Sequence, residues 1–453
     1  MTAPASRPRP ARRAIDELSL TLDRDDLEHR LADLALGEVD DRMAALAAYA
    51  ALPAETNVLY TPYIDLRAAR LENAVIDWAP SWRQVLAPLP VDADGLLVMS
   101  EGDVVGYALS DAARDAGVEF TTIADYLDRK PDRARELLEA NTLPANDKFA
   151  QLTRALWTQG AVLDVPNGVR LEKPVIVRWA VGAPDHALLT RTLVHLGDDA
   201  DAAIVEELVA SDASIPSGGQ AFFAGTTEAS LGVGASLRVA SLQELPGNVV
   251  AIQHRHAEVA EGGALRWALA QLGGRLVRSR VDNRLVGDRS SVEQVEIVFG
   301  GEEQVFDLTS YTTHIGRDTT GDLLSKGALL DRARAYMKGL ITIEKSARGT
   351  DSFLGEFGMN LAKATRSVAI PSLEIDQPDC RRAAHSSSVG PIDEAQLFYL
   401  ESRGIPPDEA RKFIVLGFLE PVVARVPLAA AQDRLRELLE EKWIAGLGGE
   451  AAA

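Results

Sequence analysis

Cysteine is almost absent from this chain, because Cys380 is the single example among 453 residues. One cysteine excludes an internal disulfide, and it also excludes a metal cage made only of cysteines from one chain. Any metal site must therefore recruit histidine, carboxylates or a second chain.

Long hydrophobic runs are missing too. No stretch approaches the roughly 18 uninterrupted apolar residues that a membrane-spanning helix requires. The first 13 residues are rich in Pro, Ala and Arg and contain no apolar segment of the kind found in secretion signals. The sequence therefore predicts a cytoplasmic protein that does not bind membranes.

Basic residues are also few, because the chain has 47 Lys and Arg against 67 Asp and Glu and a net charge of -20. Such a surface repels nucleic acids and anionic membranes, so we expect partners that are proteins or small ions. Apolar residues, by contrast, make up 46 % of the chain, which is enough for a sizeable core. The length predicts two or three structural units.

Nucleotide-binding signatures are also missing. The chain contains no Gly-x-x-x-x-Gly-Lys-Ser/Thr loop, and Gly232-Val233-Gly234 lacks the third glycine of a dinucleotide-binding turn. The sequence therefore predicts a non-catalytic protein with no catalytic residues and no tightly bound cofactor.

The pattern of apolar residues divides the chain into three parts. Three- and four-residue spacing predicts helices over residues 23–51, 103–115 and 132–157. From about residue 160 to 375, short Val/Ile/Leu-rich runs separated by Gly, Asp, Asn and Pro predict strands, and residues 322–338 fit either one helix or two strands. Many strands without intervening helices exclude a doubly wound α/β fold and leave sandwiches, barrels, propellers or a β-helix.

Helical signals return near the end of the chain. Asp393 is placed to cap one helix, Pro407 begins a second, and an apolar stripe marks a third. The stripe consists of Leu435, Leu438, Leu439 and Trp443.

The segment 390–405 resembles the carboxy-terminal signature of the SufB/SufD family of iron–sulfur cluster assembly scaffold proteins. It reads Gly-Pro-Ile-Asp-Glu-Ala-Gln-Leu-Phe-Tyr-Leu-Glu-Ser-Arg-Gly-Ile and is followed by Glu409-Ala410. Further segments follow the family in the same order along most of the chain. They are Tyr60-Thr61-Pro62, Asp147-Lys148-Phe149-Ala150, His314 with Asp318-Thr319-Thr320, and Pro371-Ser372-Leu373-Glu374-Ile375.

The resemblance implies a mainly β protein. Its expected domains are a mainly helical N-terminal domain over residues 1–158, a right-handed parallel β-helix over 159–380 and a C-terminal helical domain over 381–453. It implies two partners, namely a SufB-like paralogue that pairs through the β-helix and a SufC-like ABC ATPase that docks on the C-terminal domain. A transient iron or iron–sulfur cluster is expected at the junction with the SufB-like partner.

Two differences favour the SufD-like branch. A SufB-like sequence has a cysteine a few residues before the Pro-x-Leu/Ile-Glu strand and a Glu directly after the family histidine, whereas this chain has Ala364-Thr365-Arg366 and Ser386. The SufD-like pattern is usually Cys-Ser-His-Gly-Ala-Thr, and here Ala383 replaces its cysteine while His385 is kept. Positions 380 and 385 of one strand face opposite sides unless a bulge or turn intervenes, so we expect Cys380 not to replace the family cysteine.

Two residues are candidates for a metal or cluster junction. His385 would bind iron through a neutral imidazole, or it would simply donate a hydrogen bond to a backbone carbonyl. Cys380 is the weaker candidate: it would be reactive if Arg381 and Arg382 stabilised its thiolate, and otherwise it is a structural thiol.

Aromatic residues and Arg dominate protein interfaces, so Phe398, Tyr399 and Arg403 are candidates for contact with a partner. Alternatively they pack the first C-terminal helix against the β-helix, with Phe398 facing inward and Arg403 outward.

Three other histidines are weaker candidates. His254 and His256 share one face of a strand and would make half of a metal site, but no third ligand is evident nearby. We expect His314 to hold a turn.

Two alternative functions remain open from the sequence. One is a homodimeric scaffold that acts alone, which the missing SufB-like ligands disfavour. The other is a β-helix enzyme that acts on acidic polysaccharides, which the missing secretion signal disfavours.

Overall fold

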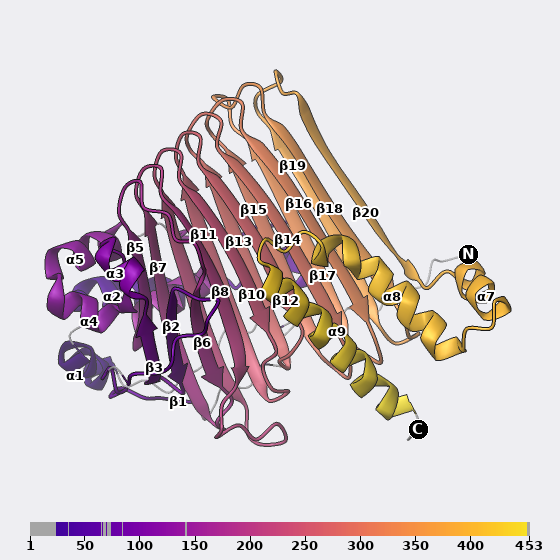
Figure 1. The fold of residues 1–453 in the computed structure, drawn as a ribbon, viewed down its shortest axis with the longest axis horizontal. Coiled ribbons are helices and arrows are strands. Elements are labelled where there is room, and N and C mark those ends of the chain that lie inside the picture. Colours follow the sequence, from indigo (N-terminus) through magenta and orange to yellow (C-terminus); the bar gives the residue numbers. More distant parts are fainter. Residues whose placement is uncertain are drawn as a thin grey trace, which may run out of the picture.

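Two long sheets form the body of the molecule (Figure 1). The computed structural model describes residues 24–450 except 35, 65, 67–68, 70–73, 84 and 141–142.

Sheet 1 has the order β19-β17-β15-β13-β11-β9-β7-β5-β4, with β1 paired to β7, and sheet 2 has the order β20-β18-β16-β14-β12-β10-β8-β6-β2-β3. The sheet 1 strands are β1 (Val75–Ile76), β4 (Glu119–Thr122), β5 (Gln159–Val165), β7 (His186–Leu196), β9 (Ala221–Leu231), β11 (Val249–Val259), β13 (Leu276–Leu285), β15 (Val305–His314), β17 (Arg334–Ile343) and β19 (Arg366–Ile375). The sheet 2 strands are β2 (Gly95–Ser100), β3 (Asp103–Leu109), β6 (Val175–Val181), β8 (Asp201–Ala210), β10 (Ser236–Gln243), β12 (Ala264–Gln271), β14 (Ser291–Gly300), β16 (Thr320–Leu329), β18 (Asp351–Asn360) and β20 (Arg382–Pro391).

From β5 onward the chain alternates between the two sheets, and neighbours within each sheet pair in parallel. This is a parallel β-solenoid of about 8 turns, so the predicted β-helix is confirmed. The strands β9, β11, β13, β15 and β17 begin 27–29 residues apart, because each turn of the coil uses a similar length of chain. Residues 322–338 form parts of two strands, β16 and β17, and no helix.

Alternating residues of each strand point into the coil, where apolar side chains from both sheets meet. Val239 and Trp267 from sheet 2 lie in the same buried cluster as Val277 and Val281 from sheet 1. The short Val/Ile/Leu-rich runs therefore form strands because one face lines the interior, while helices cover part of the other face.

The N-terminal helices cover the outer face of sheet 1. Apolar residues of α1, α2 and α6 share a buried cluster with outward-facing residues of sheet 1 such as Phe222 and Ile252. The elements of this region are α1 (Arg24–Leu34), α2 (Val39–Ala51), η1 (Thr61–Tyr63), α3 (Asp111–Asp115), α4 (Ile123–Arg129), α5 (Pro131–Glu139) and α6 (Lys148–Leu156). The predicted helices over 23–51 and 132–157 are confirmed, each as two helices.

The predicted helix over residues 103–115 is wrong for most of its length. Asp103–Leu109 forms β3, which pairs antiparallel with β2. Between the two strands, Glu101 and Gly102 both have positive φ, 49° and 105°. A two-residue turn of this kind favours a hairpin, and the Glu-Gly pair marks it in the sequence.

The C-terminal helices are α7 (Glu394–Ser402), α8 (Pro407–Val423) and α9 (Ala429–Glu450), as predicted. Helices α8 and α9 lie on the outer face of sheet 2, whereas α7 packs against α8 and projects beyond the end of the solenoid (Figure 1). Asp393 caps α7 by accepting a hydrogen bond from the Ala395 amide at 2.8 Å. Four apolar residues of α9 are buried against sheet 2, namely Leu435, Leu438, Leu439 and Trp443.

The strands continue beyond residue 380, where the sequence places a domain boundary, because β20 pairs with β18 along its whole length. This strand consists mostly of small and polar residues, so it lacks the apolar signature that marks the earlier turns. Residues 1–23 of the predicted N-terminal domain lie outside the described residues. In the described part of the chain, every helix is too short or too polar to span a membrane.

Candidate functional site

The C-terminal end of the solenoid exposes two unpaired strand edges. Strand β19 pairs only with β17, and β20 pairs only with β18, among the residues that the structure describes. Each strand is ten residues long, and all of their residues are half-buried or exposed. Long open edges invite pairing with another chain, and the exposed side chains of Ile375 (45 %) and Val389 (39 %) increase that tendency.

His385 lies on β20 within this open end. It is in register with Leu354 of β18, which is fully buried, so the histidine occupies the inward-facing side of its strand. No further turn of the coil covers it in the described structure, and His385 is therefore exposed. An inward-facing histidine in the last turn is accessible from the end of the solenoid.

A buried carboxyl group lies one turn behind His385. Glu356 of β18 is 2 % exposed and in register with Ser387, and it accepts a hydrogen bond from the Ile370 amide of β19 at 2.9 Å. Burial raises the pKa of Glu356 to about 8. Gly339 leaves room for this carboxyl group, because a Cβ there would lie 2.9 Å from its Oε1.

The sequence did not single out Glu356, or Glu296, whose pKa burial raises to about 7. Both residues point into the coil. Alternate residues of a strand point into the coil, so the sequence reveals the inward direction of these glutamates only if the inward-facing positions of each strand are known. Polar residues within the apolar runs hid which positions face inward.

Cys380 lies in the turn that joins β19 to β20 and not on a strand, so strand alternation does not decide its direction. It is half-buried against a small apolar cluster that contains Leu354. The neighbouring arginines that would stabilise a thiolate have other partners. Arg381 pairs with Asp318 at 2.5 Å, and Arg382 pairs with Asp351 at 2.6 Å.

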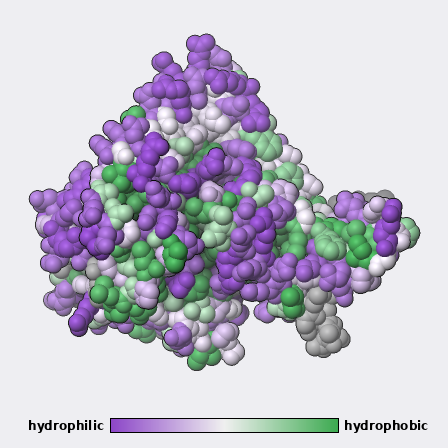
Figure 2. Space-filling view, viewed as in Figure 1, coloured by the Kyte–Doolittle hydropathy of each residue, from purple (hydrophilic) through white to green (hydrophobic). Residues whose placement is uncertain are grey.

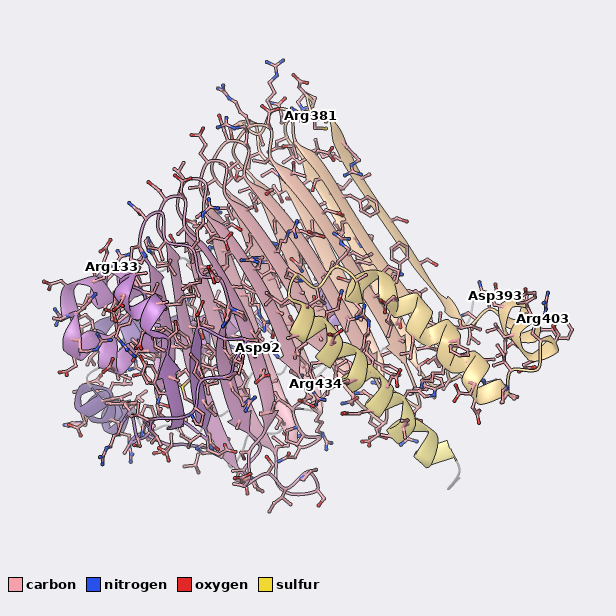
Figure 3. All side chains as sticks on the ribbon, viewed as in Figure 1. Asp92, Arg133, Arg381, Asp393, Arg403 and Arg434 are labelled. Atoms are coloured by element: carbon pink, nitrogen blue, oxygen red, sulfur yellow. The ribbon has the colours of Figure 1, made fainter. Side chains whose placement is uncertain are left out.

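The predicted partner-contact residues lie at the other end of β20 from Cys380. Figure 3 shows Arg381 at the tip of the turns and Arg403 on the projecting helices, far from each other. Phe398 is 72 % exposed, so the expectation that it faces inward is wrong; Leu397 is the buried residue of α7. The Arg403 guanidinium lies 5.1 Å from the centre of the Tyr399 ring.

The exposed surface of α7 and α8 is apolar to an unusual degree. Phe398, Tyr399 and Phe413 all expose more than half of their area, and Figure 2 shows apolar surface on this projecting part, at the right of the view. Such a patch, rimmed by charged groups, is typical of a protein–protein contact. Because α7 packs mainly against α8, this surface is presented away from the solenoid.

Apart from His256, which lines a separate cavity, the other described histidines have partners within the chain. His314 is buried and hydrogen-bonds with Thr319 (2.8 Å) and Ser352 (3.0 Å), so it holds the turn after β15 as predicted. His254 hydrogen-bonds with Asp282 at 2.6 Å. No group of three or more His, Cys, Asp or Glu side chains is placed to hold a metal ion within the described residues. A cluster at the open end would therefore require ligands from a second chain.

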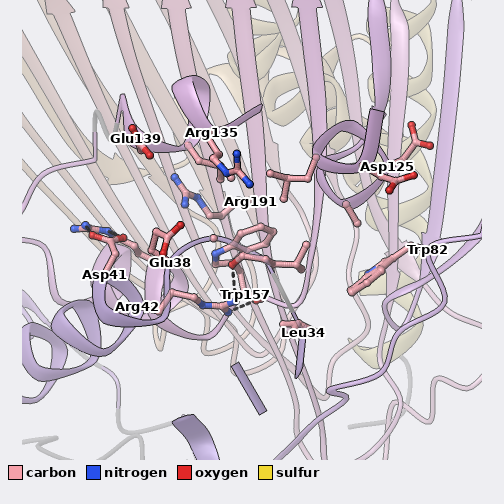
Figure 4. Close-up of a pocket in the computed structure, with 17 residues that line it drawn as sticks. Leu34, Glu38, Asp41, Arg42, Trp82, Asp125, Arg135, Glu139, Trp157 and Arg191 are labelled. Carbon is pink, nitrogen blue, oxygen red and sulfur yellow. Dashed lines mark hydrogen bonds and ion pairs between the residues drawn. The ribbon is translucent and has the colours of Figure 1, made fainter. Parts of the chain in front are cut away.

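A cavity of about 830 Å³ lies beneath the N-terminal helices, and none of the predicted site residues lines it (Figure 4). Arg42 donates hydrogen bonds to the carbonyl oxygens of Ala155 (2.9 Å), Leu36 (3.0 Å) and Trp157. Burial and the nearby Arg191 lower the pKa of Arg42 to about 9. These contacts hold α2 against α6, so we assign Arg42 to the packing of this domain.

Comparison with known proteins identifies the family of this chain. The model of the SUF system FeS cluster assembly SufBD core domain matches residues 179–418, just over half of the chain. The chain belongs to the SufBD core family. Residues 179–418 include the solenoid from β6 onward, the open end with His385, and most of the projecting helices, so the family match and the candidate site coincide.

Relatives of this SufBD-family chain support its SufD-like character. It is 29 % identical over 337 residues to the iron–sulfur cluster assembly protein SufD of Bacillus subtilis, covering 74 % of this chain and 76 % of that protein. It is 26 % identical over 342 residues to an iron–sulfur cluster assembly SufBD family protein of Staphylococcus epidermidis, covering 76 % and 72 %. The predicted membership of the SufB/SufD family, on its SufD-like side, is confirmed.

Proposed function

We propose that this chain is a SufD-like scaffold subunit of a SUF iron–sulfur cluster assembly complex. In this complex the open end of the solenoid pairs with a SufB-like paralogue, and the apolar surface of α7 and α8 docks a SufC-like ABC ATPase. The nascent iron–sulfur cluster is cargo that forms at the junction, and His385 supplies one ligand from this side.

The observation that supports the proposal most is the asymmetry of the two ends. At the N-terminal end, the edge strand β4 has only four residues. The outer edge of β3 is partly covered, because its Tyr107 forms a bridge with Leu86. At the C-terminal end, β19 and β20 both stop with ten-residue open edges. Short, covered edges prevent association, whereas long open ones permit it.

Co-purification tests the pairing. The chain would be co-expressed with the SufB-like and SufC-like proteins of its source and analysed by size exclusion. Val389→Lys and Ile375→Lys place charges on the open edges and should lower recovery of the complex by about tenfold or more, as expected for residues central to an interface. Val233→Lys is the matched control, because Val233 is 49 % exposed in a turn away from both edges.

Each outcome of that experiment is informative. A complex that forms with wild type and Val233→Lys, but not with the edge variants, supports the proposal. A complex that tolerates both edge variants overturns pairing through the open end. A chain that forms only dimers with itself, and ignores the other two proteins, favours the homodimeric scaffold.

The docking of the ATPase is tested separately. Phe398→Ala should weaken recovery of the SufC-like protein while the SufB-like protein remains bound, because the two contacts use different surfaces. Leu86→Ala is the control, since Leu86 is 85 % exposed at the N-terminal end. Equal recovery of all three proteins with Phe398→Ala would contradict the assignment of this surface.

A further inference from the structure

A second cavity lies between sheet 1 and the N-terminal domain, away from the open end. Its floor consists of outward-facing residues of β11, β13 and β15, and its roof comes from residues 56–57 and from the segment around Pro144 and Asn146. Its volume is about 630 Å³, which is within the range of small-molecule sites.

His256 is the unexplained residue in this cavity. It is 2 % exposed, and neither ring nitrogen has a hydrogen-bond partner among the described residues. A buried polar group without a partner is costly, so such a group calls for a partner that the chain itself does not supply. His254, two residues earlier on the same face, differs in being bound to Asp282.

Around His256 the carboxylate groups are already paired, whereas N–H groups remain available to donate hydrogen bonds. The carboxylates on its own and neighbouring strands are already paired with guanidinium groups. These pairs are Asp282 with Arg280 (2.7 Å), Glu258 with Arg284 (3.0 Å) and Glu228 with Arg191 (2.8 Å), while Asp147 of the roof pairs with Arg280 (2.8 Å). Arg284 uses only its Nε in the contacts of the described residues, so its terminal amino groups remain for a ligand.

The protonation states favour the same conclusion. Burial would lower the pKa of His254, but Asp147 and Asp282 raise it above its ordinary value. Burial lowers the pKa of His256 to about 4, and His254, Arg284 and Arg280 act in the same direction against the opposing charge of Asp282. At pH 7 the His256 ring is therefore neutral and has one N–H to donate.

We propose that this cavity binds the oxyanion group of a small molecule, held by the N–H of His256 and the terminal amino groups of Arg284. A metal ion is not the ligand that the site suits, because the described residues offer no set of three ligands there. Charge-assisted hydrogen bonds from Arg and His suit both phosphoryl and carboxylate oxygens, so either chemistry would satisfy the site. This inference does not depend on the proposed function.

Nuclear magnetic resonance of the full wild-type chain with ¹⁵N-labelled histidine tests the proposal, because binding is measured on the wild-type protein. Inorganic phosphate and malonate would be titrated separately at pH 7 and constant ionic strength, with chloride as the balancing anion. The His256 signals, assigned from their loss in His256→Gln, should shift saturably with at least one probe. The bound anion should raise the pKa of His256 from about 4 by about one unit, so binding should strengthen only as the pH falls toward that range, well below the pH 7 of the titration.

Arg284→Gln should weaken binding of that probe about tenfold, the scale of one charge-assisted hydrogen bond. Arg289→Gln is the matched control, because Arg289 is exposed and pairs with Glu261 in a turn elsewhere. Saturation by phosphate alone or by malonate alone supports the site and identifies its chemistry. No saturable shift with either probe, or equal binding by the Arg284→Gln variant, overturns the proposal.

Discussion

At the scale of single residues, His385 is the side chain proposed to bind the cluster. It is exposed, faces inward in the last turn, and contacts no structural partner in the described hydrogen-bond network. The sequence singled it out because it keeps the histidine of the SufD-like pattern. Its accessibility was not predicted, because that depends on where the coil ends.

His385→Ala should reduce cluster maturation by roughly tenfold or more, the scale on which groups at metal sites act. Folding should be unaffected, because the side chain is exposed. The measurement is iron–sulfur enzyme activity in cells that depend on the variant, together with its thermal midpoint. Normal maturation would show that His385 is not a ligand.

Cys380→Ser is the companion change at the same end. Replacing a half-buried thiol with a hydroxyl should cost about 1 kcal/mol of stability and leave maturation close to wild type. The same cellular assay and midpoint measure it. Complete loss of maturation in a folded variant would show that Cys380 does replace the family cysteine.

Glu356 predicts a pH dependence of stability. Its folded pKa of about 8 is above its unfolded value, so the folded state binds the extra proton between about pH 4.5 and 8. Stability therefore falls by up to about 1.4 kcal/mol per pH unit as the pH rises through that window, and it is constant above it. Glu356→Gln should remove this fall in stability, because glutamine does not ionise.

The comparison of Glu356→Gln with wild type is made by urea unfolding at several pH values. The free energy of unfolding of the variant should rise relative to that of wild type from pH 5.5 to 8, and the difference should stay constant above pH 8. For Glu303→Gln, at an exposed position, the curve of stability against pH should stay parallel to that of wild type at every pH. Parallel curves for Glu356→Gln would mean that its carboxyl group is already ionised in the folded chain.

At the scale of elements, α9 illustrates what apolar spacing predicts well. The stripe that includes Leu435 and Trp443 is buried as the sequence indicates, and the Trp443 ring lies 6.4 Å from that of Phe299. Residues 103–109 illustrate what it predicts badly, because a hairpin turn and not periodicity determines that segment. Phe398 was misplaced for a similar reason: α7 is apolar on more than one side, and only its docking on α8 decides which side is buried.

Trp443→Ala should destabilise the docking of α9 by about 3 to 5 kcal/mol, the usual cost of removing a large buried aromatic group. Limited proteolysis should then cleave the C-terminal region faster. Ile444→Ala is the adjacent control, because Ile444 is 64 % exposed. Equal cleavage of the two variants would mean that α9 is not held by this contact.

At the scale of the whole molecule, the structure is a coil with one open end and a projecting helical arm near that end. Strand content and the helical termini could be predicted from the sequence, whereas the stacking into a solenoid came from the family resemblance. Local patterns do not encode which strand pairs with which, since those contacts join residues about one turn apart. The same limit applies to the cavity around His256, which unites residues from distant segments.

The central claim is that the open end is a pairing surface, and hydrogen–deuterium exchange tests it most directly. Exchange would be measured on the chain alone and in complex with the SufB-like protein. The account predicts that amides of β19 and β20 become protected in the complex, while those of β3 and β4 do not change. A stable complex in which β19 and β20 exchange as fast as in the free chain would contradict it.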